Sequence, residues 1–351
     1  MNHRAAALAL LSAVLFGVST PAAKALLGTI DPVILAGLLY CGAGFGIGVL
    51  RRLAAPMLRQ AKLAQAQLVR GDIPWLAGAV VAGGIAGPIL MMLGLYRTEA
   101  AAASLLLTME GVATALLAWF VFHENFDRRI ALGMGCLVAG ALIVSWTGAP
   151  SISGLLGPLA ILGACLAWGI DNNLTRKVSL ADPLQIVEVK GVIAGPINIL
   201  IGLVAGGALP GFSTITLAGI VGLLGYGVSL ALFVFALRDL GTARTGAYFS
   251  IAPFIGAVAA LVFLHEPLTW QLILAGLLMG FGVWLHLTEH HEHDHEHQPM
   301  EHSHAHVHDQ HHRHVHGPSD PPGVPHTHRH RHLRLRHRHP HVPDMHHLHR
   351  H

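Results

Sequence analysis

The sequence predicts an all-α membrane protein of ten transmembrane helices followed by a disordered tail. Three observations lead there: the composition, ten apolar stretches of membrane-spanning length, and an abrupt change in composition after residue 288. Of the 351 residues, 53% are hydrophobic, 12% are charged and 40 are glycine, whereas a soluble domain has about 25% charged residues and about 7% glycine. This number of charged residues is too small to cover the surface of a soluble protein. An ordinary cytosolic enzyme is therefore excluded.

The ten stretches lie within the first 288 residues and are separated by short polar or Pro/Gly-containing segments. The hydrocarbon core of a bilayer is about 30 Å thick, and about 20 apolar residues in a helix cross it. The expected spans are 5–27, 32–50, 73–95, 98–121, 129–147, 155–175, 183–206, 214–237, 243–264 and 269–288.

Lys and Arg in the short loops predict the orientation, because such residues concentrate on the cytoplasmic side. With the N-terminus inside, twelve of them are cytoplasmic, and only Lys24 and Arg97 lie outside. We therefore expect an integral protein of the inner (plasma) membrane with both termini in the cytoplasm. The cytoplasmic set is Arg4, Arg51, Arg52, Arg59, Lys62, Arg70, Arg128, Arg129, Arg176, Lys177, Arg238 and Arg244.

The chain also resembles itself across its midpoint. Residues 95–97 and 122–124 recur at 237–239 and 264–266, at an offset of 142, and Phe16-Gly17 recurs as Trp168-Gly169, at an offset of 152. This predicts a first repeat over 1–147, a second over 148–288, and a tail over 289–351. Each repeat holds five spans, an odd number, so the second enters the membrane inverted. Transporters with inverted repeats bind their substrate near the midplane between the halves.

These repeated motifs resemble the drug/metabolite transporter superfamily, specifically proteins with two EamA-type repeats. The matching residues are Trp168-Gly169 with Arg176-Lys177, Phe16-Gly17 with Lys24, and two His-Glu motifs, His123-Glu124-Asn125-Phe126 and His265-Glu266-Pro267-Leu268. The resemblance covers residues 5–288. It implies two five-helix repeats and secondary transport of a small metabolite, by export or exchange, without ATP hydrolysis.

No enzymatic motif accompanies this resemblance. The phosphate-binding pattern Gly-x-x-x-x-Gly-Lys-(Ser/Thr) is absent from the sequence. The zinc-protease pattern His-Glu-x-x-His is not completed, because Asp127 and Thr269 stand where the second His is required. We therefore expect no enzyme activity and interpret both His-Glu pairs as structural turns.

Ionisable residues within the expected spans are the candidate substrate-binding residues, because charges are costly in a bilayer and default to function. They are Glu110, Asp171 with its neighbour Asn172, Glu188 and Lys190. Lys190 needs a partner on another helix, and Asp171 and Glu110 are both candidates. Such a pair either releases a proton or a substrate ammonium as the bundle moves, or holds two helices together permanently.

Prolines and glycines suggest where the helices bend and pack. Pro21, Pro88, Pro196 and Pro253 interrupt four spans, and each either forms an ordinary kink or frees backbone carbonyls for cargo. Gly-x-x-x-Gly stripes, such as Gly42 with Gly46, allow close helix contact. Most of these stripes serve internal packing, and some are candidates for pairing two protomers in a homodimer.

The tail holds 24 of the 28 histidines and no core-forming apolar pattern. Neutral imidazole is the commonest metal ligand, so we expect binding of divalent Ni, Zn, Co or Cu by exchanging sites, with no cofactor required for the bundle. The rival interpretations are a sensor of acidity and attachment to anionic lipid headgroups; nucleic acid binding is not expected. The candidate metal ligands are His290, His291, His293, His295, His297, His302, His304, His306, His308, His311, His312, His314 and His316.

The sequence thus favours a secondary transporter, an exporter or exchanger of a small metabolite, with a metal-binding cytoplasmic tail. Its partners are a small-molecule substrate, membrane lipid and divalent transition metal ions. The alternative is a protein of divalent-metal homeostasis, either a cation efflux carrier or a membrane-bound metal sensor. The four histidines outside the tail, at positions 3, 123, 265 and 286, lie at span ends, which makes a cation carrier the weaker interpretation.

Overall fold

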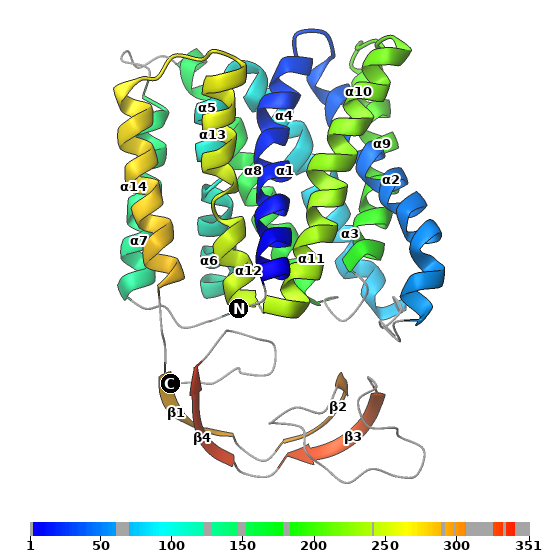
Figure 1. Cartoon of the computed structure of the whole chain (residues 1–351), viewed down its shortest axis with the longest axis vertical. Helices are drawn as coiled ribbons and strands as arrows, with labels where there is room; N and C mark the ends of the chain where they lie inside the picture. The colour runs from blue at the N-terminus through cyan, green and yellow to red at the C-terminus, as the bar shows by residue number, and fades with distance from the viewer. Residues whose placement is uncertain are drawn as a thin grey trace.

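A bundle of upright helices forms the body of the molecule in the computed structural model (Figure 1). The structure describes residues 3–60, 70–122, 128–146, 152–177, 183–240, 242–288, 292–297, 300–306, 326–332 and 335–340. The helices of the first half are α1 (His3–Leu26), α2 (Pro32–Gln60), η1 (Arg70–Asp72), α3 (Ile73–Ala79), η2 (Val80–Ala86), α4 (Gly87–Arg97), α5 (Ala100–Leu106), α6 (Met109–Phe122) and α7 (Arg128–Val144). Those of the second half are α8 (Ile152–Lys177), α9 (Pro183–Val204), α10 (Phe212–Gly222), η3 (Leu223–Val228), α11 (Ser229–Leu240), α12 (Thr242–Phe249), α13 (Ala252–Phe263) and α14 (Trp270–Leu287).

The predicted all-α membrane class is confirmed. Within the described residues, nine stretches are long and apolar enough to cross a bilayer. The fifth expected span, α7, has 17 residues and is shorter than these nine. It packs along α14, as a membrane-crossing helix does (Figure 1). The exact number of ten spans therefore stays a prediction.

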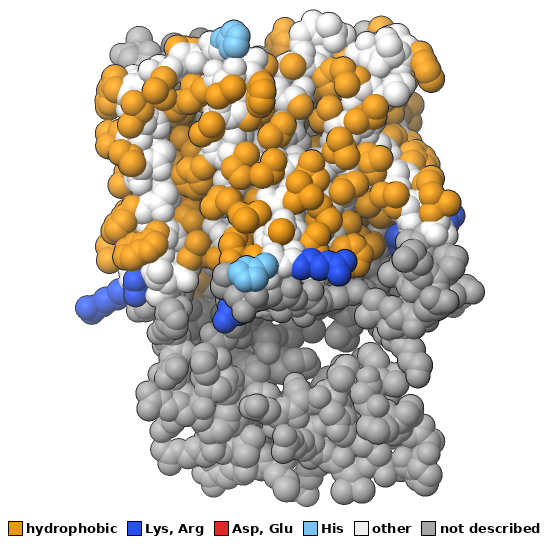
Figure 2. Space-filling model, viewed as in Figure 1, with side chains coloured by type: hydrophobic (Ala, Val, Ile, Leu, Met, Phe, Trp, Pro, Cys, Tyr) orange, Lys and Arg blue, Asp and Glu red, His pale blue; other side chains and the backbone are white. Residues whose placement is uncertain are grey.

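The surface of the bundle is apolar. Large side chains such as Leu132, Val204 and Phe212 are exposed, and Figure 2 shows a wide hydrophobic band with Lys and Arg gathered along its lower edge. A patch of this size on a soluble protein would drive aggregation, whereas lipid tails are as apolar as Leu. The interior is instead lined by small residues that bring backbones together. A methyl group on Gly44 or Gly191, for example, would overlap the facing helix, which explains how α2 and α9 pack so closely.

Four spans are broken or distorted in their middle, two in each half. The third span contains the π-helix η2, and the eighth contains the π-helix η3, which begins 143 residues later. The fourth span is divided into α5 and α6, and the ninth into α12 and α13, again 143 residues further on. Pro88 follows η2 and Pro253 opens α13, as expected for residues that cannot donate a backbone hydrogen bond. Breaks at matching places in two halves are typical of transporters.

The helices pack as two groups. In the α8 group, α3, η2, α4 and α6 pack around α8; in the α1 group, α10, η3, α11, α12 and α13 pack around α1. Helix α5, the upper part of the fourth span, packs chiefly on α13 and α1 and less extensively on α8. The pairs α2–α9 and α7–α14 complete the bundle (Figure 1). Each group therefore combines helices from both halves of the chain. The boundary between the two groups does not coincide with the boundary between the two sequence repeats.

The described parts of the tail form strands, so the expectation of a tail without secondary structure is wrong for them. Strand β1 (Glu292–His297) pairs with β4 (Leu335–Pro340), and β2 (Met300–His306) pairs with β3 (His326–His332), both antiparallel. The register places Asp294 opposite Arg338 and Glu296 opposite Arg336. The physical reason is the alternation of His with acids before the Pro-rich break and with Arg after it, a period of two.

We predict that tags placed before α1 and after α14 are accessible from the same side of the membrane, the cytoplasm. Helix α1 begins and α14 ends at the same end of the bundle (Figure 1), and the cationic loops favour that end as the inner one. Protease protection of both tags in intact cells and in inverted vesicles is the measurement. A C-terminal tag reached from outside intact cells contradicts both the span count and the orientation.

Candidate functional site

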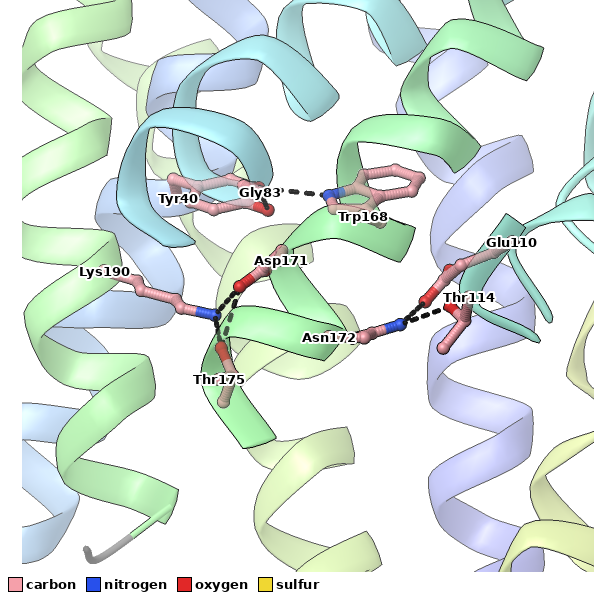
Figure 3. Close-up of polar contacts among 9 residues, drawn as sticks. All are labelled: Tyr40, Gly83, Glu110, Thr114, Trp168, Asp171, Asn172, Thr175 and Lys190. Carbon is pink, nitrogen blue, oxygen red and sulfur yellow. Dashed lines mark hydrogen bonds and ion pairs between the residues drawn. The ribbon is translucent and has the colours of Figure 1, made fainter. Parts of the chain in front are cut away.

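Polar side chains from three helices meet α8 in the interior of the bundle (Figure 3). The Lys190 ammonium on α9 lies 2.5 Å from Asp171 Oδ1 and donates to Thr175 Oγ1 at 3.0 Å. The Thr175 hydroxyl donates to the same Asp171 oxygen at 2.8 Å. Both charged side chains are about seven-eighths buried, with 12% of Asp171 and 15% of Lys190 exposed. Of the two candidate partners of Lys190, the structure therefore selects Asp171.

A second polar contact lies on another face of α8, toward α6 (Figure 3). The Asn172 amide donates to Glu110 Oε1 at 2.9 Å and to Thr114 Oγ1 at 3.2 Å. Glu110 stands in the first turn of α6, directly after the break in the fourth span, where the amide end of a helix favours a negative charge. Within the described residues, the ion pairs of the bundle do not include Glu110. The site thus holds one paired carboxylate and one without a cationic partner.

Backbone carbonyls of the π-helix η2 accept hydrogen bonds from side chains of α2, α8 and α9 beside this cluster. Gly83 O accepts from the Tyr40 hydroxyl at 2.7 Å and from Trp168 Nε1 at 3.0 Å, and Gly84 O accepts from Asn198 Nδ2 at 2.9 Å. Pro88 has no N–H and leaves a carbonyl of this turn without its helical partner. Side chains of the protein donate to these carbonyls in this structure, and a role of the Pro88 carbonyls in binding cargo stays a prediction.

Glu188 lies apart from this cluster. Its carboxylate forms ion pairs with the guanidinium groups of Arg51 and Arg52 on α2, the latter at 3.3 Å. Glu188 and Lys190 are two residues apart and point to different sides of α9, as expected for a helix. The structure thus brings together Glu110, Asp171, Asn172 and Lys190, and separates Glu188 from them.

An aromatic arc on the α1 group was not predicted. Rings of Tyr40, Tyr226, Phe16 and Phe249 contact one another in sequence, with centroid distances of 6.1 Å, 6.0 Å and 5.2 Å. Tyr40 connects this arc to the polar cluster through Gly83. These rings come from α1, α2, η3 and α12, so no local spacing in the sequence reveals them.

A charged corner joins the two groups at the end of the bundle where α1 finishes, here called the Lys24 end. Lys24 Nζ donates to Leu95 O at 2.7 Å and to Thr98 O at 2.8 Å. Glu266 accepts from the backbone amides of Ala100 and Ala101, at 2.6 Å and 2.8 Å. Burial raises the pKa of Glu99 in the same corner, the hydrogen bond and repulsion from Glu266 raise it further, and Lys24 partly offsets them.

The metal-binding prediction is not resolved by this geometry. Within the described part of the chain, His, Cys, Asp and Glu do not form a cluster of three that fits a metal ion. His293, His295 and His297 lie on β1, and His302, His304 and His306 lie on β2. The other candidate ligands, His290, His291, His308, His311, His312, His314 and His316, lie outside the described residues, as do His123 and Glu124.

Apolar spans, distorted helices at matching places in two halves, and charges buried between them define the class of a membrane transporter. The model of the EamA-like transporter family matches residues 3–146 and 155–288. The chain therefore belongs to this family.

Known proteins agree with this assignment. The chain is 27% identical over 289 residues to an uncharacterized transporter of Methanothermobacter thermautotrophicus, covering 78% of this chain and 82% of that protein. It is 26% identical over 212 residues to a probable amino-acid metabolite efflux pump of Salmonella typhimurium, covering 55% and 69%. One solved crystal structure shares the fold with a TM-score of 0.58 and 15% identity, over 82% of this chain and 97% of that one.

We predict that Gly83→Ala destabilises the protein, because a methyl group there overlaps the Asp171 carboxylate. Overpacking of this kind costs about 1–3 kcal/mol, and moving Asp171 also weakens its contact with Lys190. Gly219→Ala on α10 is the matched control, since a methyl group there meets open space. Thermal unfolding of the purified variants is the measurement, and equal midpoints for the two variants would show that the close approach at Gly83 is unimportant.

Proposed function

We propose that this protein is a secondary transporter of a small metabolite, and that the polar cluster on α8 binds the cargo or the proton that drives it. The observation that carries the proposal is the pair of carboxylates inside membrane helices, Asp171 bound to Lys190 and Glu110 without a cation beside it. Charges placed so are expensive and mark transport pathways. Membership of a transporter family supports the same conclusion.

The two carboxylates have different roles in this proposal. Glu110 is neutralised either by a proton or by a positively charged group of the cargo, since a bare carboxylate in a bundle of membrane helices is costly. A zwitterionic cargo suits the site further, because its ammonium can displace Lys190 from Asp171 while its carboxylate takes up Lys190. The relative named a probable amino-acid metabolite efflux pump supports a cargo of this kind, carried by export or exchange.

The tail is proposed as a separate metal-binding segment. Its histidine content supports this role, and it needs no contact with the α8 cluster. Metal homeostasis stays the alternative function, with the tail as the active part. The bundle gives a cation carrier no support within the described residues, where His, Cys, Asp and Glu do not gather in threes.

We predict that Glu110→Gln and Lys190→Met reduce transport per folded molecule by about tenfold or more, the loss expected when an essential interaction with cargo or proton is removed. Purified protein in proteoliposomes with labelled amino acids as the first cargo panel is the assay. Glu188→Gln is the matched control, because its ion pairs with Arg51 and Arg52 lie outside the cluster.

Loss of folding is separated from loss of transport by a double variant. Removing one member of a buried pair leaves an uncompensated charge and destabilises by about 3–5 kcal/mol. Asp171→Asn combined with Lys190→Met removes both charges, so it recovers stability while transport stays lost. Full transport in Glu110→Gln and in the double variant would overturn the proposed role of the cluster.

We predict that deleting residues 290–351 removes most binding of Ni²⁺ or Zn²⁺ by the purified protein and leaves metal-free transport largely unchanged. The segment holds 24 of the 28 histidines, and it follows the last helix of the bundle. Calorimetric titration with each metal and uptake in chelator-treated proteoliposomes are the measurements. Loss of all transport without metal would show that the tail is part of the transport machinery, whereas normal transport with metal-sensitive cells favours the metal-homeostasis alternative.

A further inference from the structure

Within the described residues, the fourth and ninth spans contact each other at the Lys24 end of the bundle. The upper parts of the broken spans, α5 and α13, contact each other directly. Their lower parts have separate neighbours, since α6 packs on α8 and α12 packs on α1 and α11. The breaks at Leu107–Thr108 and Ser250–Ile251 separate these two levels. The conformation described is therefore closed across the groups at the Lys24 end.

A bidentate cap closes that end. Each oxygen of the Glu266 carboxylate accepts one of the first two backbone amides of α5, at 2.6 Å and 2.8 Å. These amides have no partner inside their own helix, and a charged acceptor makes such hydrogen bonds stronger than neutral ones. Glu266 follows α13 of the α1 group, and α5 continues past the break at Leu107–Thr108 into α6, which packs on α8. This cap therefore joins the α1 group to the fourth span.

The chain is bent to present this carboxylate. His265 has φ of 56°, which makes it the one non-glycine residue with positive φ within the described residues. This left-handed conformation is unfavourable for a residue with a Cβ atom. His265 Nδ1 lies 2.9 Å from Val262 O, so the end of α13 is closed locally while the next residue turns outward. Strain of this kind is typical of positions that a function requires.

Lys24 makes the second connection across the same boundary. It lies in the last turn of α1 and donates to Leu95 O and Thr98 O, at the corner between α4 and α5. The corner is thus held from both sides by charged groups of the α1 group, Lys24 at its carbonyl end and Glu266 at its amide end. Both contacts break when the α1 group moves away from α4 and the fourth span, because each joins a side chain, Lys24 or Glu266, to the backbone of those helices.

We propose that Glu266 is a gating residue that latches the Lys24 end of the pathway shut and releases α5 when that end opens. The inference rests on the proposed transport function, and it assigns to the His-Glu motif of the second repeat a role beyond a structural turn. A helix cap is easier to break during opening than a buried salt bridge, because water can form hydrogen bonds with both the exposed amides of α5 and the Glu266 carboxylate after they separate.

Cysteine labelling tests the latch without any cargo. Full-length protein with Cys41, Cys136 and Cys165 replaced by Ala carries Ser104→Cys as the single thiol. Ser104 lies on α5 below the cap, is 1% exposed and faces Gly256 of α13. A membrane-impermeant maleimide is supplied to sealed vesicles of each orientation, so that each end of the bundle is probed separately.

Glu266→Gln is expected to speed labelling from the Lys24 side about tenfold or more, the effect of losing a hydrogen bond to a charged group, and to leave labelling from the other side unchanged. Lys24→Met is the second variant and is expected to act in the same direction. Glu99→Gln is the matched control. It changes the neighbouring carboxyl of the same corner, its amide can still donate a hydrogen bond to Glu266, and it is expected to leave labelling slow.

The latch is overturned if Glu266→Gln is labelled at the rate of the parent protein. It is also overturned if Glu266→Gln is labelled equally fast from both sides, because that result indicates a general loosening of the bundle after loss of a structural cap. The same holds if Glu266→Gln does not fold and Lys24→Met labels at the parent rate. Failure of the proposed function is distinguishable from failure of the latch. Full transport in Glu110→Gln and in the Asp171→Asn, Lys190→Met double variant would overturn the cargo site, while one-sided labelling in Glu266→Gln would still support the latch.

Discussion

The requirement that every backbone polar group inside a membrane find a partner shapes the centre of this protein. Pro88 has no N–H group to donate to the turn before it, and the carbonyls of Gly83 and Gly84 accept hydrogen bonds instead from Tyr40, Trp168 and Asn198. These donors come from α2, α8 and α9, so side-chain hydrogen bonds connect three other helices to the carbonyls of η2. Trp168 in turn fixes the rotation of α8, and Asp171 and Asn172 follow within its next turn. The placement of the charges depends on this backbone exchange.

Small residues make that exchange geometrically possible. Gly83 accepts two donors at its carbonyl while Asp171 lies against its Cα, where no side chain would fit. Gly44 and Gly191 let α2 and α9 approach to backbone contact, which carries Tyr40 and Lys190 to the same site. Charged side chains then act at longer range, pairing Glu188 with Arg51 at one end of α2 and linking Lys24 to Thr98 at the opposite end of the bundle.

Local patterns revealed the spans, the buried charges and both His-Glu motifs, because each depends on residues close together in the chain. The Lys190 partner could be narrowed to two carboxylates, and only the folded structure, in which the Lys190 ammonium reaches Asp171 on α8, distinguishes Asp171 from Glu110. Glu188 looked equivalent to Lys190 in the sequence, yet its side of α9 faces α2. The aromatic arc and the capping of α5 by Glu266 join residues more than a hundred positions apart, which no periodicity encodes. The tail strands were missed because a period-two pattern of His and charges was judged by its lack of apolar residues alone.

The two halves share their backbone design but not their chemistry. Gly83 of η2 lies against Asp171 of α8, and Gly225 of η3 lies against Ser19 of α1, at positions that the sequence repeat aligns. Ser19 bonds back to Phe16 O within its own helix, so the α1 group presents aromatic rings where the α8 group presents charges. In the proposed mechanism, a cargo bound by its polar groups to the α8 cluster meets the aromatic rings of Phe16, Tyr226 and Phe249 on the α1 group, whose contacts are largely apolar and non-directional. The same mechanism lets the α1 group move past a bound cargo with few hydrogen bonds to break, while the two hydrogen bonds from Ala100 and Ala101 to Glu266 break when the Lys24 end opens. The proposed latch thereby places the barrier for opening at the Lys24 end.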